Sequence, residues 1–298
     1  MTEPSPTGSG VLQVPHLRRR RIVNKSMEAL ALLTALIAVG VLVLVVFSVA
    51  RRSWSALNLD LLTKTPIPFS LTNEPTGLAN AFVGSIVIVG LATLMALPVG
   101  ILIAIYLNEF APPKINASVS LVLDVLNGIP AIVIGIFVYG LVVVGHGQSG
   151  YAGAFALACL MLPLVARSTQ EILVLVPNST REASLALGVP RWRTTLSIVL
   201  PQTIGGIVTG TTLAVARVAG ETAPLLFTSS IVGTSINFNP AHALQTIPVA
   251  IFEYSESPDP KDHAQAWAAS LVLLIFILVA NLGARALAAR SKRRMGLG

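Results

Sequence analysis

Long uncharged apolar stretches alternate with shorter polar segments along most of the chain. The stretch 29–50 contains no charged residue and, at about 1.5 Å per residue, is long enough to cross a hydrocarbon core of about 30 Å. Five further stretches of this kind lie at 78–107, 117–144, 151–166, 203–228 and 264–284. The apolar residues are continuous rather than alternating, which favours helices over barrel strands in lipid. The pattern predicts an all-α integral membrane protein with six transmembrane helices.

The polar segments divide the chain around these spans. Residues 1–28 form a basic tail, whose first 15 residues are rich in Pro, Ser, Gly and Thr and are expected to be disordered. The stretch 29–50 is longer than the apolar core of a signal peptide and lacks a small-x-small cleavage site, so we interpret it as an uncleaved anchor. The transmembrane domain then covers 29–290 and includes a long polar loop at 167–202, and a second tail covers 291–298.

The distribution of Lys and Arg predicts the orientation. If the N-terminus is cytosolic, 15 of the 20 cations lie on the inner side, four lie outside and Arg217 lies within a span. The inner cations are Arg18, Arg19, Arg20, Arg21, Lys25, Lys114, Arg167, Arg181, Arg191, Arg193, Arg285, Arg290, Lys292, Arg293 and Arg294. The positive-inside rule therefore places both termini and the loop 167–202 in the cytosol.

Composition narrows the function classes. Only 11% of the residues are charged and the mean hydropathy is +0.78, whereas a soluble domain carries about 25% charged residues. The net charge of +7 gathers at the ends of apolar runs, so nucleic-acid binding is not expected. One cysteine and four scattered histidines supply no metal-ligand spacing, and we expect no metal site. The chain contains no G-x-x-x-x-G-K-[ST] sequence for binding nucleotide phosphates and no catalytic Ser-His-Asp set.

The loop 167–202 contains a candidate docking helix. Thr180 could cap a helix that begins near Arg181, with Glu182 in its first turn. Gly188 would end this helix, and Pro190 follows shortly after. Two interpretations remain open from the residues alone: a surface for a soluble partner, or a helix that merely links two spans.

This loop resembles the EAA loop of ABC importer permeases. Glu182-Ala183-Ser184 is followed after three residues by Gly188 and after nine more by Ile198, with Pro201 closing the motif. Ser184 stands where the second Ala is usual. The resemblance implies a MetI-like permease fold without an ATPase site of its own, in which Arg181, Glu182, Ala183, Ser184 and Gly188 form a helix that couples to a cytosolic ATPase.

A second segment narrows the resemblance to the permease A family of phosphate-specific ABC importers. The segment 216–228, with the sequence ARVAGETAPLLFT, looks like the signature of that family. Shorter similar motifs occur at 77–81, 98–100, 104–109, 126–130, 247–248, 253–254 and 266–268, so the resemblance runs from about 75 to 285. Ala131 stands where a Ser is expected after Gly-Ile-Pro, a small exchange.

The resemblance implies a function and a set of partners. We expect the chain to form half of the translocation path of an ATP-driven phosphate importer in the bacterial cytoplasmic membrane. Its partners would be an ABC ATPase dimer, a second homologous permease, an extracytoplasmic phosphate-binding protein and membrane lipids. ATP and Mg would bind to the ATPase, and this chain would hold no cofactor.

Arg217 and Glu221 are the candidate residues of the translocation path. An ionisable residue in the middle of the bilayer is costly, at about 2.5–3.5 kcal/mol on insertion scales, and normally faces a cavity or a partner. Their spacing of four residues permits an ion pair on one face of the fifth span, more than a helical turn from either end. Arg217 could also exchange this carboxylate for a passing anion, since guanidinium suits phosphate oxygens. The resemblance points to the path, and the neutral pair remains open as the resting state.

Other polar and small residues are candidates for pairing, packing or surface contacts. Asp124 and Asn127 form a possible polar site in the inner half of the third span, where we expect Asp124 to pair with an inner Arg. Glu109 is expected to be a solvated interface residue. Gly206, Gly210 and Ala214 form a small-residue row that predicts close helix packing. A net-acidic outer loop with Glu253, Glu256, Asp259 and Asp262 is a candidate contact for a binding protein.

Three alternatives to phosphate import remain open. The chain could be a permease for another oxyanion such as molybdate or sulfate, with the same EAA loop. It could be a membrane enzyme acting on a lipid phosphate, with Arg217 as an anchor and Glu221 as an acid or base, although a second catalytic group at similar depth is not obvious. It could also be an assembly subunit with no transport path.

Overall fold

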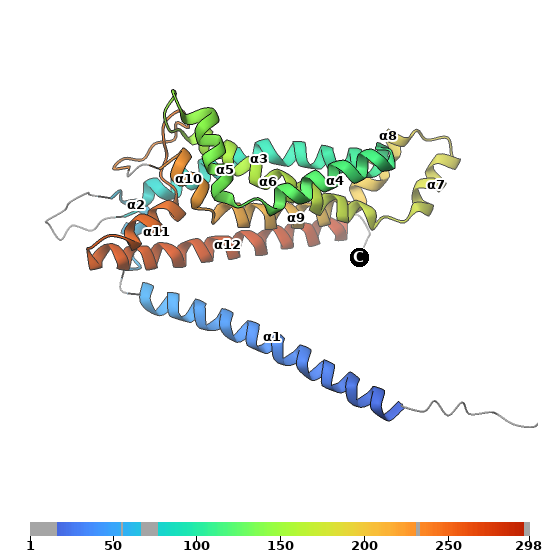
Figure 1. Ribbon diagram of the computed structural model, residues 1–298, viewed down its shortest axis with the longest axis horizontal. Coiled ribbons are helices and arrows are strands. Elements are labelled where there is room, and N and C mark those ends of the chain that lie inside the picture. The colour runs from blue at the N-terminus through green and yellow to red at the C-terminus, as the bar shows by residue number, and fades with distance from the viewer. Residues whose placement is uncertain (1–16, 55, 67–76, 231–232, 295–298) are drawn as a thin grey trace, which may run out of the picture. The chain divides into compact units, whose positions relative to one another are not determined.

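The computed structural model describes residues 17–54, 56–66, 77–230 and 233–294 (Figure 1). Over these ranges the chain is helical and contains no strand. The long helices are α1 Leu17–Ser53, α3 Ala79–Ile105, α4 Pro113–Gly128, α6 Gly150–Val174, α9 Leu200–Ala219 and α12 Pro260–Arg294. The short ones are α2 Asp60–Thr63, α5 Ala131–Val138, α7 Asn178–Ala186, α8 Arg191–Thr194, α10 Ala223–Thr228 and α11 Ile247–Ser255, with π-helical turns η1 Tyr106–Phe110, η2 Tyr139–Val143 and η3 Thr195–Val199.

The first of two structural units, Met1–Ser48, contains most of α1. Its described side chains are exposed all round the helix, and the large apolar ones include Leu36 at 60% and Leu44 at 64%. A helix that is apolar on every face is typical of a membrane span. The predicted span 29–50 lies inside α1, while the N-terminal 16 residues of the predicted tail lie outside the described residues.

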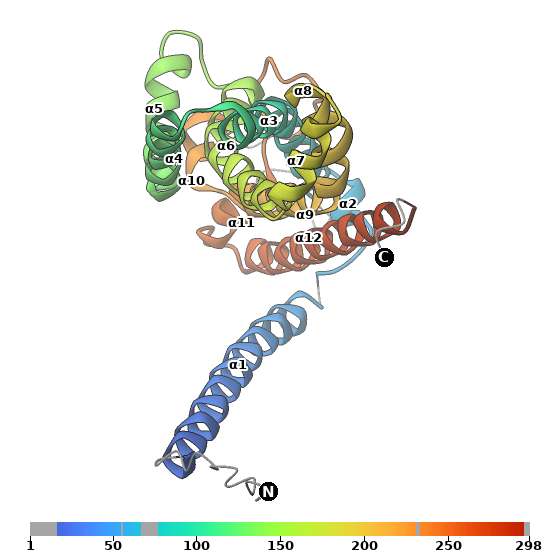
Figure 2. The same ribbon diagram turned by 90° about the vertical axis from the view of Figure 1, so that its right-hand side faces the viewer.

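The second unit, Val49–Gly298, is built around α6. This helix contacts α3, α4, α5, α9 and α10, and 61% of its most apolar stretch is buried, against 22–28% for α3, α9 and α12. In the end-on view of Figure 2 it lies among these neighbours. Many of its buried residues are Ala or Gly, which let neighbouring helices approach closely. The central core joins Ile88 of α3, Leu157 and Met161 of α6, and Val218 of α9.

The small-residue row on α9 packs against α6, as the sequence predicts. A Cβ atom added at Gly206 would lie 2.6 Å from Ile172 Cγ2, and one added at Gly210 would lie 2.8 Å from Ser168 Oγ. Ala214, the third member, is buried in the core. The row therefore serves close packing within this chain.

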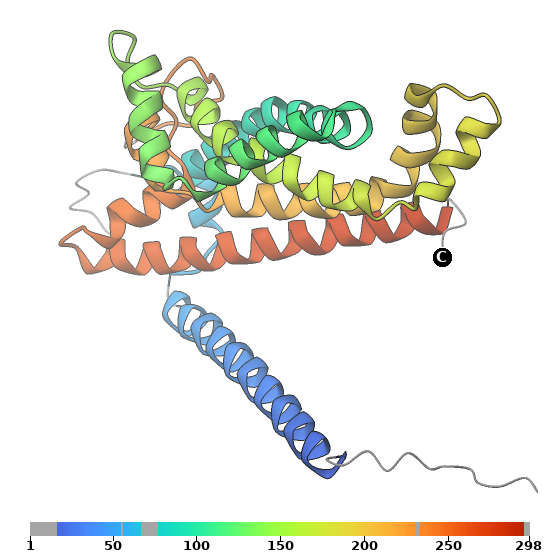
Figure 3. The same cartoon turned by 45° about the vertical axis from the view of Figure 1, so that its right-hand side comes forward.

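Two of the predicted spans are interrupted. The stretch 117–144 is not one straight helix, because α4 and α5 meet at 96° across Ile129 and Pro130 (Figure 3). Pro130 lacks an N–H and biases the residue before it away from helical geometry, so the helix ends there. The stretch 203–228 is also divided, since α9 ends at Ala219 and α10 begins at Ala223, with Pro224 in its first turn.

These interruptions affect the number of spans. Within the described residues, five helices are long and apolar enough to cross a membrane, or up to six if the bent pair α4–α5 counts as one. The fourth predicted span, 151–166, belongs to a longer helix, because α6 continues through the polar residues to Val174. The sixth, 264–284, likewise lies inside the longer α12, which extends into the predicted C-terminal tail as far as Arg294.

Figures 1 and 3 show the arrangement that positions the candidate sites within this second unit. Helix α12 runs alongside α9, with α7 and α8 near one end of these helices and α2, α10 and α11 near the other. We refer to the two regions as the α7–α8 end and the α10–α11 end.

Candidate coupling and translocation sites

Helix α7 begins earlier than the sequence suggests. Its first residue is Asn178, directly after Pro177, so Thr180 lies inside the helix and does not cap it. The end is as predicted, because Gly188 follows with a φ of +77°, a conformation that glycine adopts without strain. Its N–H donates to Leu185 O at 2.9 Å, and the next N–H, of Val189, donates to Ser184 O at 3.2 Å.

Two of the five predicted coupling residues face inward. Ser184 is buried, and its hydroxyl lies 2.8 Å from Thr194 Oγ1 of α8. The Ser that replaces the usual Ala thus has a partner in α8. Arg181 is also largely buried, with 17% of its side chain exposed.

The remaining coupling residues are accessible. Glu182, Ala183 and Gly188 are exposed, and so are Leu187 at 84% and Trp192 at 59%. Such a mixed apolar and charged surface on a short helix is typical of a docking site.

Glu109 is the main polar partner of Arg181, and the expectation that Glu109 is solvated is wrong. Its carboxylate is 9% exposed and accepts three bonds from Arg181, from Nη2 to Oε1 at 2.8 Å and from Nε to both oxygens at 3.2 Å. Asn108 Nδ2 donates to Oε1 as well, at 2.7 Å. The two residues are 72 positions apart, so spacing could not reveal the pair.

A cleft of about 430 Å³ lies beside this pair at the α7–α8 end. Its lining residues are Asn108, Glu109, Val174, Asn178, Arg181, Glu182, Leu185, Arg191 and Thr194. These residues come from η1, α6, α7 and α8. Its two Arg and two Glu side chains balance in charge.

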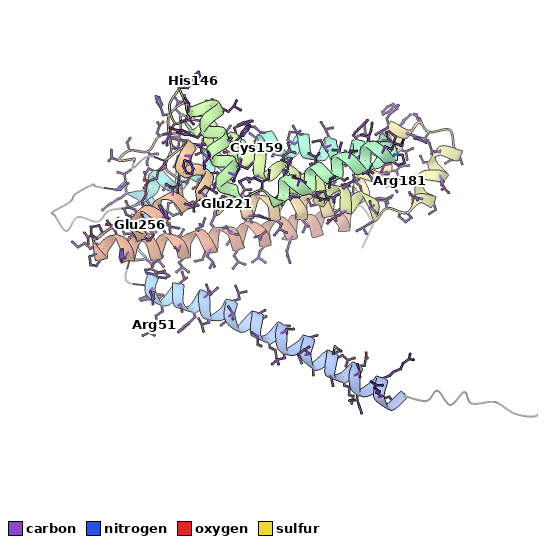
Figure 4. All side chains as sticks on the ribbon, viewed as in Figure 1. Arg51, His146, Cys159, Arg181, Glu221 and Glu256 are labelled. Atoms are coloured by element: carbon purple, nitrogen blue, oxygen red, sulfur yellow. The ribbon has the colours of Figure 1, made fainter. Side chains whose placement is uncertain are left out.

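Arg217 and Glu221 do not lie on one helical face. Arg217 is exposed in the last turn of α9, and Glu221 is half-buried in the break between α9 and α10. Among the described residues they form no ion pair or hydrogen bond with each other. The i,i+4 ion pair that the spacing permits is therefore not the resting arrangement, because the helix ends at Ala219. Figure 4 shows Glu221 well away from Arg181.

Asp124 pairs with an Arg, as predicted. Arg167 Nη2 of α6 donates to its Oδ2 at 2.7 Å, although both side chains are partly exposed, at 31% for Arg167 and 51% for Asp124. Asn127 does not join this pair, and its buried Oδ1 has no hydrogen-bond partner among the described residues. A functional role for Asp124 and Asn127 stays a prediction.

The α10–α11 end contains a polar network that sequence reasoning missed. Asn80 Nδ2 of α3 donates at 2.7 Å both to Gly233 O and to Gln245 Oε1. Gln245 Nε2 then donates to Glu253 Oε2 of α11 at 2.9 Å, and Ser230 Oγ donates to Oε1 at 3.4 Å. The network joins segments that no local pattern connects.

Glu253 is therefore not part of an open acidic surface. Burial raises the pKa of its carboxyl above the ordinary value, and this exceeds the opposing effect of the bonds from Gln245 and Ser230. Burial, together with Asp262 and Glu253, raises the pKa of the neighbouring Tyr254 to about 12. Glu256 and Asp259 are exposed, and Asp262 accepts a bond from Ser257 Oγ at 2.6 Å. No cluster of three metal-ligating side chains occurs in the described ranges.

Comparison with known proteins first defines the class. Residues 96–295 match the family "Binding-protein-dependent transport system inner membrane component". A solved bacterial ABC transporter for the import of alginate aligns over 90% of this chain and 98% of its own, with a TM-score of 0.59 at 16% identity. The MetNI methionine ABC transporter aligns over 72% and 93%, with a TM-score of 0.56 at 18% identity. The fold is that of a multi-pass inner-membrane ABC permease.

More similar relatives define the family within this class. The phosphate transport system permease protein PstA of Haemophilus influenzae is 40% identical over 270 residues, which cover 89% of this chain and 94% of the relative. PstA 1 of Mycobacterium tuberculosis is 36% identical over 288 residues, covering 94% and 92%. The chain therefore belongs to the PstA permease family of binding-protein-dependent transport systems. The resemblance found in the sequence is confirmed.

Proposed function

We propose that this chain is the transmembrane permease subunit of an ATP-driven importer of inorganic phosphate. The observation that carries the proposal is its identity of 36–40% with PstA phosphate permeases over about nine tenths of its length. The ABC permease fold implies association with an ABC ATPase and with another permease subunit. This chain would then supply half of the translocation path. A phosphate-binding protein would deliver the anion on the side of the membrane opposite the ATPase, and ATP and Mg would bind to the ATPase.

The orientation follows from the charges at the two ends. Lys114, Arg181, Arg191 and Arg193 belong to the segments that bound the α7–α8 end, and α12 runs toward the same end (Figure 1). Lys64 and Lys261 lie in segments near the α10–α11 end. The positive-inside rule supports an α7–α8 end and a C-terminus in the cytosol, and the basic residues that precede the first span support the same side for the N-terminus.

In this arrangement α7 and α8 would contact the ATPase. Their exposed surface of Glu182, Ala183, Leu187, Gly188 and Trp192 supports the proposal, because it combines apolar side chains with charge outside the helical core. ATP binding and hydrolysis would move this surface and so switch the path between the two faces of the membrane.

Arg217 is the candidate anion contact in the path. It is exposed within this chain, and its side chain forms no hydrogen bond or ion pair with the described residues, which leaves its planar donors accessible. A single guanidinium can bind an anion weakly enough to release it, as conduction requires. Glu221 nearby in the sequence would limit retention of the anion.

Transport assays with the assembled complex test the substrate. This chain, the second permease, the ATPase and the binding protein are reconstituted in proteoliposomes, and ATP-dependent uptake of radioactive phosphate is measured with an excess of molybdate or sulfate. We expect that neither molybdate nor sulfate reduces the uptake of phosphate. Preferential uptake of molybdate or sulfate would assign the alternative oxyanion function, and the absence of ATP-dependent uptake would contradict an importer.

A pair of substitutions tests the coupling surface. The double variant Glu182→Ala/Gly188→Ala removes the exposed carboxylate. It also places an alanine at the positive φ of position 188, which costs about 1–2 kcal/mol in strain at the end of α7. We expect the ATPase to detach or to hydrolyse ATP without uptake. Ser179→Ala is the matched control, since Ser179 is exposed on the same helix. Retention of both the ATPase and full uptake in the double variant would contradict the coupling role.

A further inference from the structure

Glu109 lies in an unusual backbone segment. It belongs to η1, the π-helical turn that continues α3 and ends at Phe110, before Ala111 and Pro112. π-helical turns are rare and often occur at functional sites. The turn places a nearly buried carboxylate at the extremity of one of the helices that pack most extensively on α6.

Arg181 connects this turn to two other elements. Besides its three bonds to Glu109, it donates from Nη1 to Val176 O at 2.6 Å and from Nη2 to Leu173 O at 3.0 Å. The carbonyls at a helix C-terminus have no partner within the helix, and here a guanidinium from α7 satisfies one of them together with a carbonyl of the connection that follows. A single side chain thus ties α7 to the end of α6 and to the end of α3.

A second set of bonds links η1 to α4. Asn116 Nδ2 donates to Leu107 O of η1 at 3.0 Å, and Gln170 Nε2 donates to Asn116 Oδ1 at 3.2 Å. Arg167 Nη1 donates to Gln170 Oε1 at 2.9 Å, and its Nη2 bonds to Asp124. Hydrogen bonds therefore continue from η1 into α4, up to one turn before the bend between α4 and α5.

We propose that Glu109 is the positioning residue that fixes α7 to the end of α3. Force applied to the exposed face of α7 then reaches α3 and α4 directly. Without the pair, that force would be taken up by the short connection 175–177 between α6 and α7. The inference rests on the proposed function, because it assumes that a partner drives α7, and it adds the residue through which the movement passes.

A purely stabilising role is the competing explanation, and energetics separates the two. Removing one member of a buried ion pair leaves an uncompensated charge and is strongly destabilising, whereas removing both members is often neutral. If the pair only stabilised the fold, the double variant would recover both assembly and transport. If the pair positions α7, the double variant would recover assembly but not transport.

The experiment compares Glu109→Gln, Arg181→Gln and the double variant Glu109→Gln/Arg181→Gln in the complete complex. Co-purification measures assembly, and proteoliposomes measure ATP hydrolysis and phosphate uptake. We expect the single variants to assemble poorly. The double variant should assemble, hydrolyse ATP and transport about tenfold less phosphate per ATP, within the usual range of coupling between sites. Glu171→Gln is the matched control, since Glu171 is an exposed carboxylate near the same end of α6.

Two results would overturn the proposal. One is a double variant with the uptake-to-ATP ratio of the unmodified complex. The other is a double variant that fails to assemble, which would show that the pair is required for the fold itself. A failure of the proposed function is visible separately, because the unmodified complex would then carry another oxyanion or none. If the complex carries another oxyanion, the ratio of uptake to ATP hydrolysis is measured with that oxyanion.

Discussion

The α7–α8 end and the α10–α11 end hold their polar segments by different means. At the α7–α8 end one ion pair, Arg181 with Glu109, joins three elements through a single guanidinium. At the α10–α11 end the bonds to Asn80, Gln245 and Glu253 are shared among several mostly neutral side chains. Arg217 and Glu221, in the last turn of α9 and in the break before α10, form no bond with each other in the part of the chain that the structure describes.

The difference has a mechanical consequence. If Glu109 positions α7 as proposed, a pair that concentrates its bonds in one side chain moves as a unit, so displacement of α7 would reach the end of α3. A network of neutral hydrogen bonds can lose one member and keep the others, since each contributes only about 0.5–1.5 kcal/mol. An end that a partner drives is better served by the first arrangement, and an end that only holds a loop in place by the second.

The largest expected effect on transport concerns Arg217. Arg217→Gln should lower phosphate uptake about 100-fold, the equivalent of roughly 3 kcal/mol of charge-assisted hydrogen bonding, while assembly and basal ATP hydrolysis persist. Uptake and ATPase assays on the same proteoliposomes measure this. Arg217→Lys, which keeps the charge, should retain part of the uptake. Unchanged uptake in the Gln variant would remove Arg217 from the path.

The next prediction contrasts the buried pair with an exposed one. Arg181→Gln leaves Glu109 buried and uncompensated and should destabilise the complex by about 3–5 kcal/mol. Asp124→Asn breaks a pair that is partly exposed and should cost less than about 1 kcal/mol. Thermal unfolding of the purified complex in detergent compares the two. Equal losses would show that burial does not distinguish these ion pairs.

A smaller loss is expected from the α10–α11 network. Asn80→Ala removes two donated bonds and leaves Gly233 O and Gln245 Oε1 without this donor, which should cost about 2 kcal/mol. The bond from Gln245 to Glu253 remains, so uptake should fall less than in the double variant of the ion pair. The same unfolding and uptake assays apply. Complete uncoupling by Asn80→Ala would contradict the distinction between the two ends.

The smallest effect depends on pH. Because burial raises the pKa of Glu253, the folded state disfavours the charged carboxylate, and stability is lost as pH rises above the ordinary value of 4.5. Glu253→Gln removes this loss, so the variant should gain thermal stability relative to the unmodified chain at pH 8 but not at pH 4. A difference in melting temperature that is independent of pH would contradict this assignment.

Much of the fold could be predicted because hydropathy reports directly which segments enter the membrane. The row Gly206, Gly210 and Ala214 also gave its packing role, since small residues at four-residue spacing share one helical face. The break between α4 and α5 was missed, because an apolar stretch can continue across a bend, and Gly128 with Pro130 is the local signal that could have revealed it. Pro224 does predict an end or kink in the fifth span, but the interruption comes earlier, because α9 ends at Ala219 and Pro224 lies in the first turn of α10.

The candidate sites also contain features that local sequence predicts and features that it does not. Gly188 ends α7 as predicted, because a positive φ is a local requirement that a glycine meets. The Arg217–Glu221 pair, which the sequence left open, does not form, because i,i+4 spacing brings side chains together only while the helix continues.

The sequence by itself determined that this chain enters a membrane, where its apolar segments lie and to which permease family it is similar. These properties depend on composition and on short motifs, which act locally. Only the tertiary structure decided that Arg181 pairs with Glu109, 72 positions away, and that Asn80 meets Gln245. Helix packing brings such residues together, and no periodicity along the chain encodes which charged side chain becomes buried beside which partner.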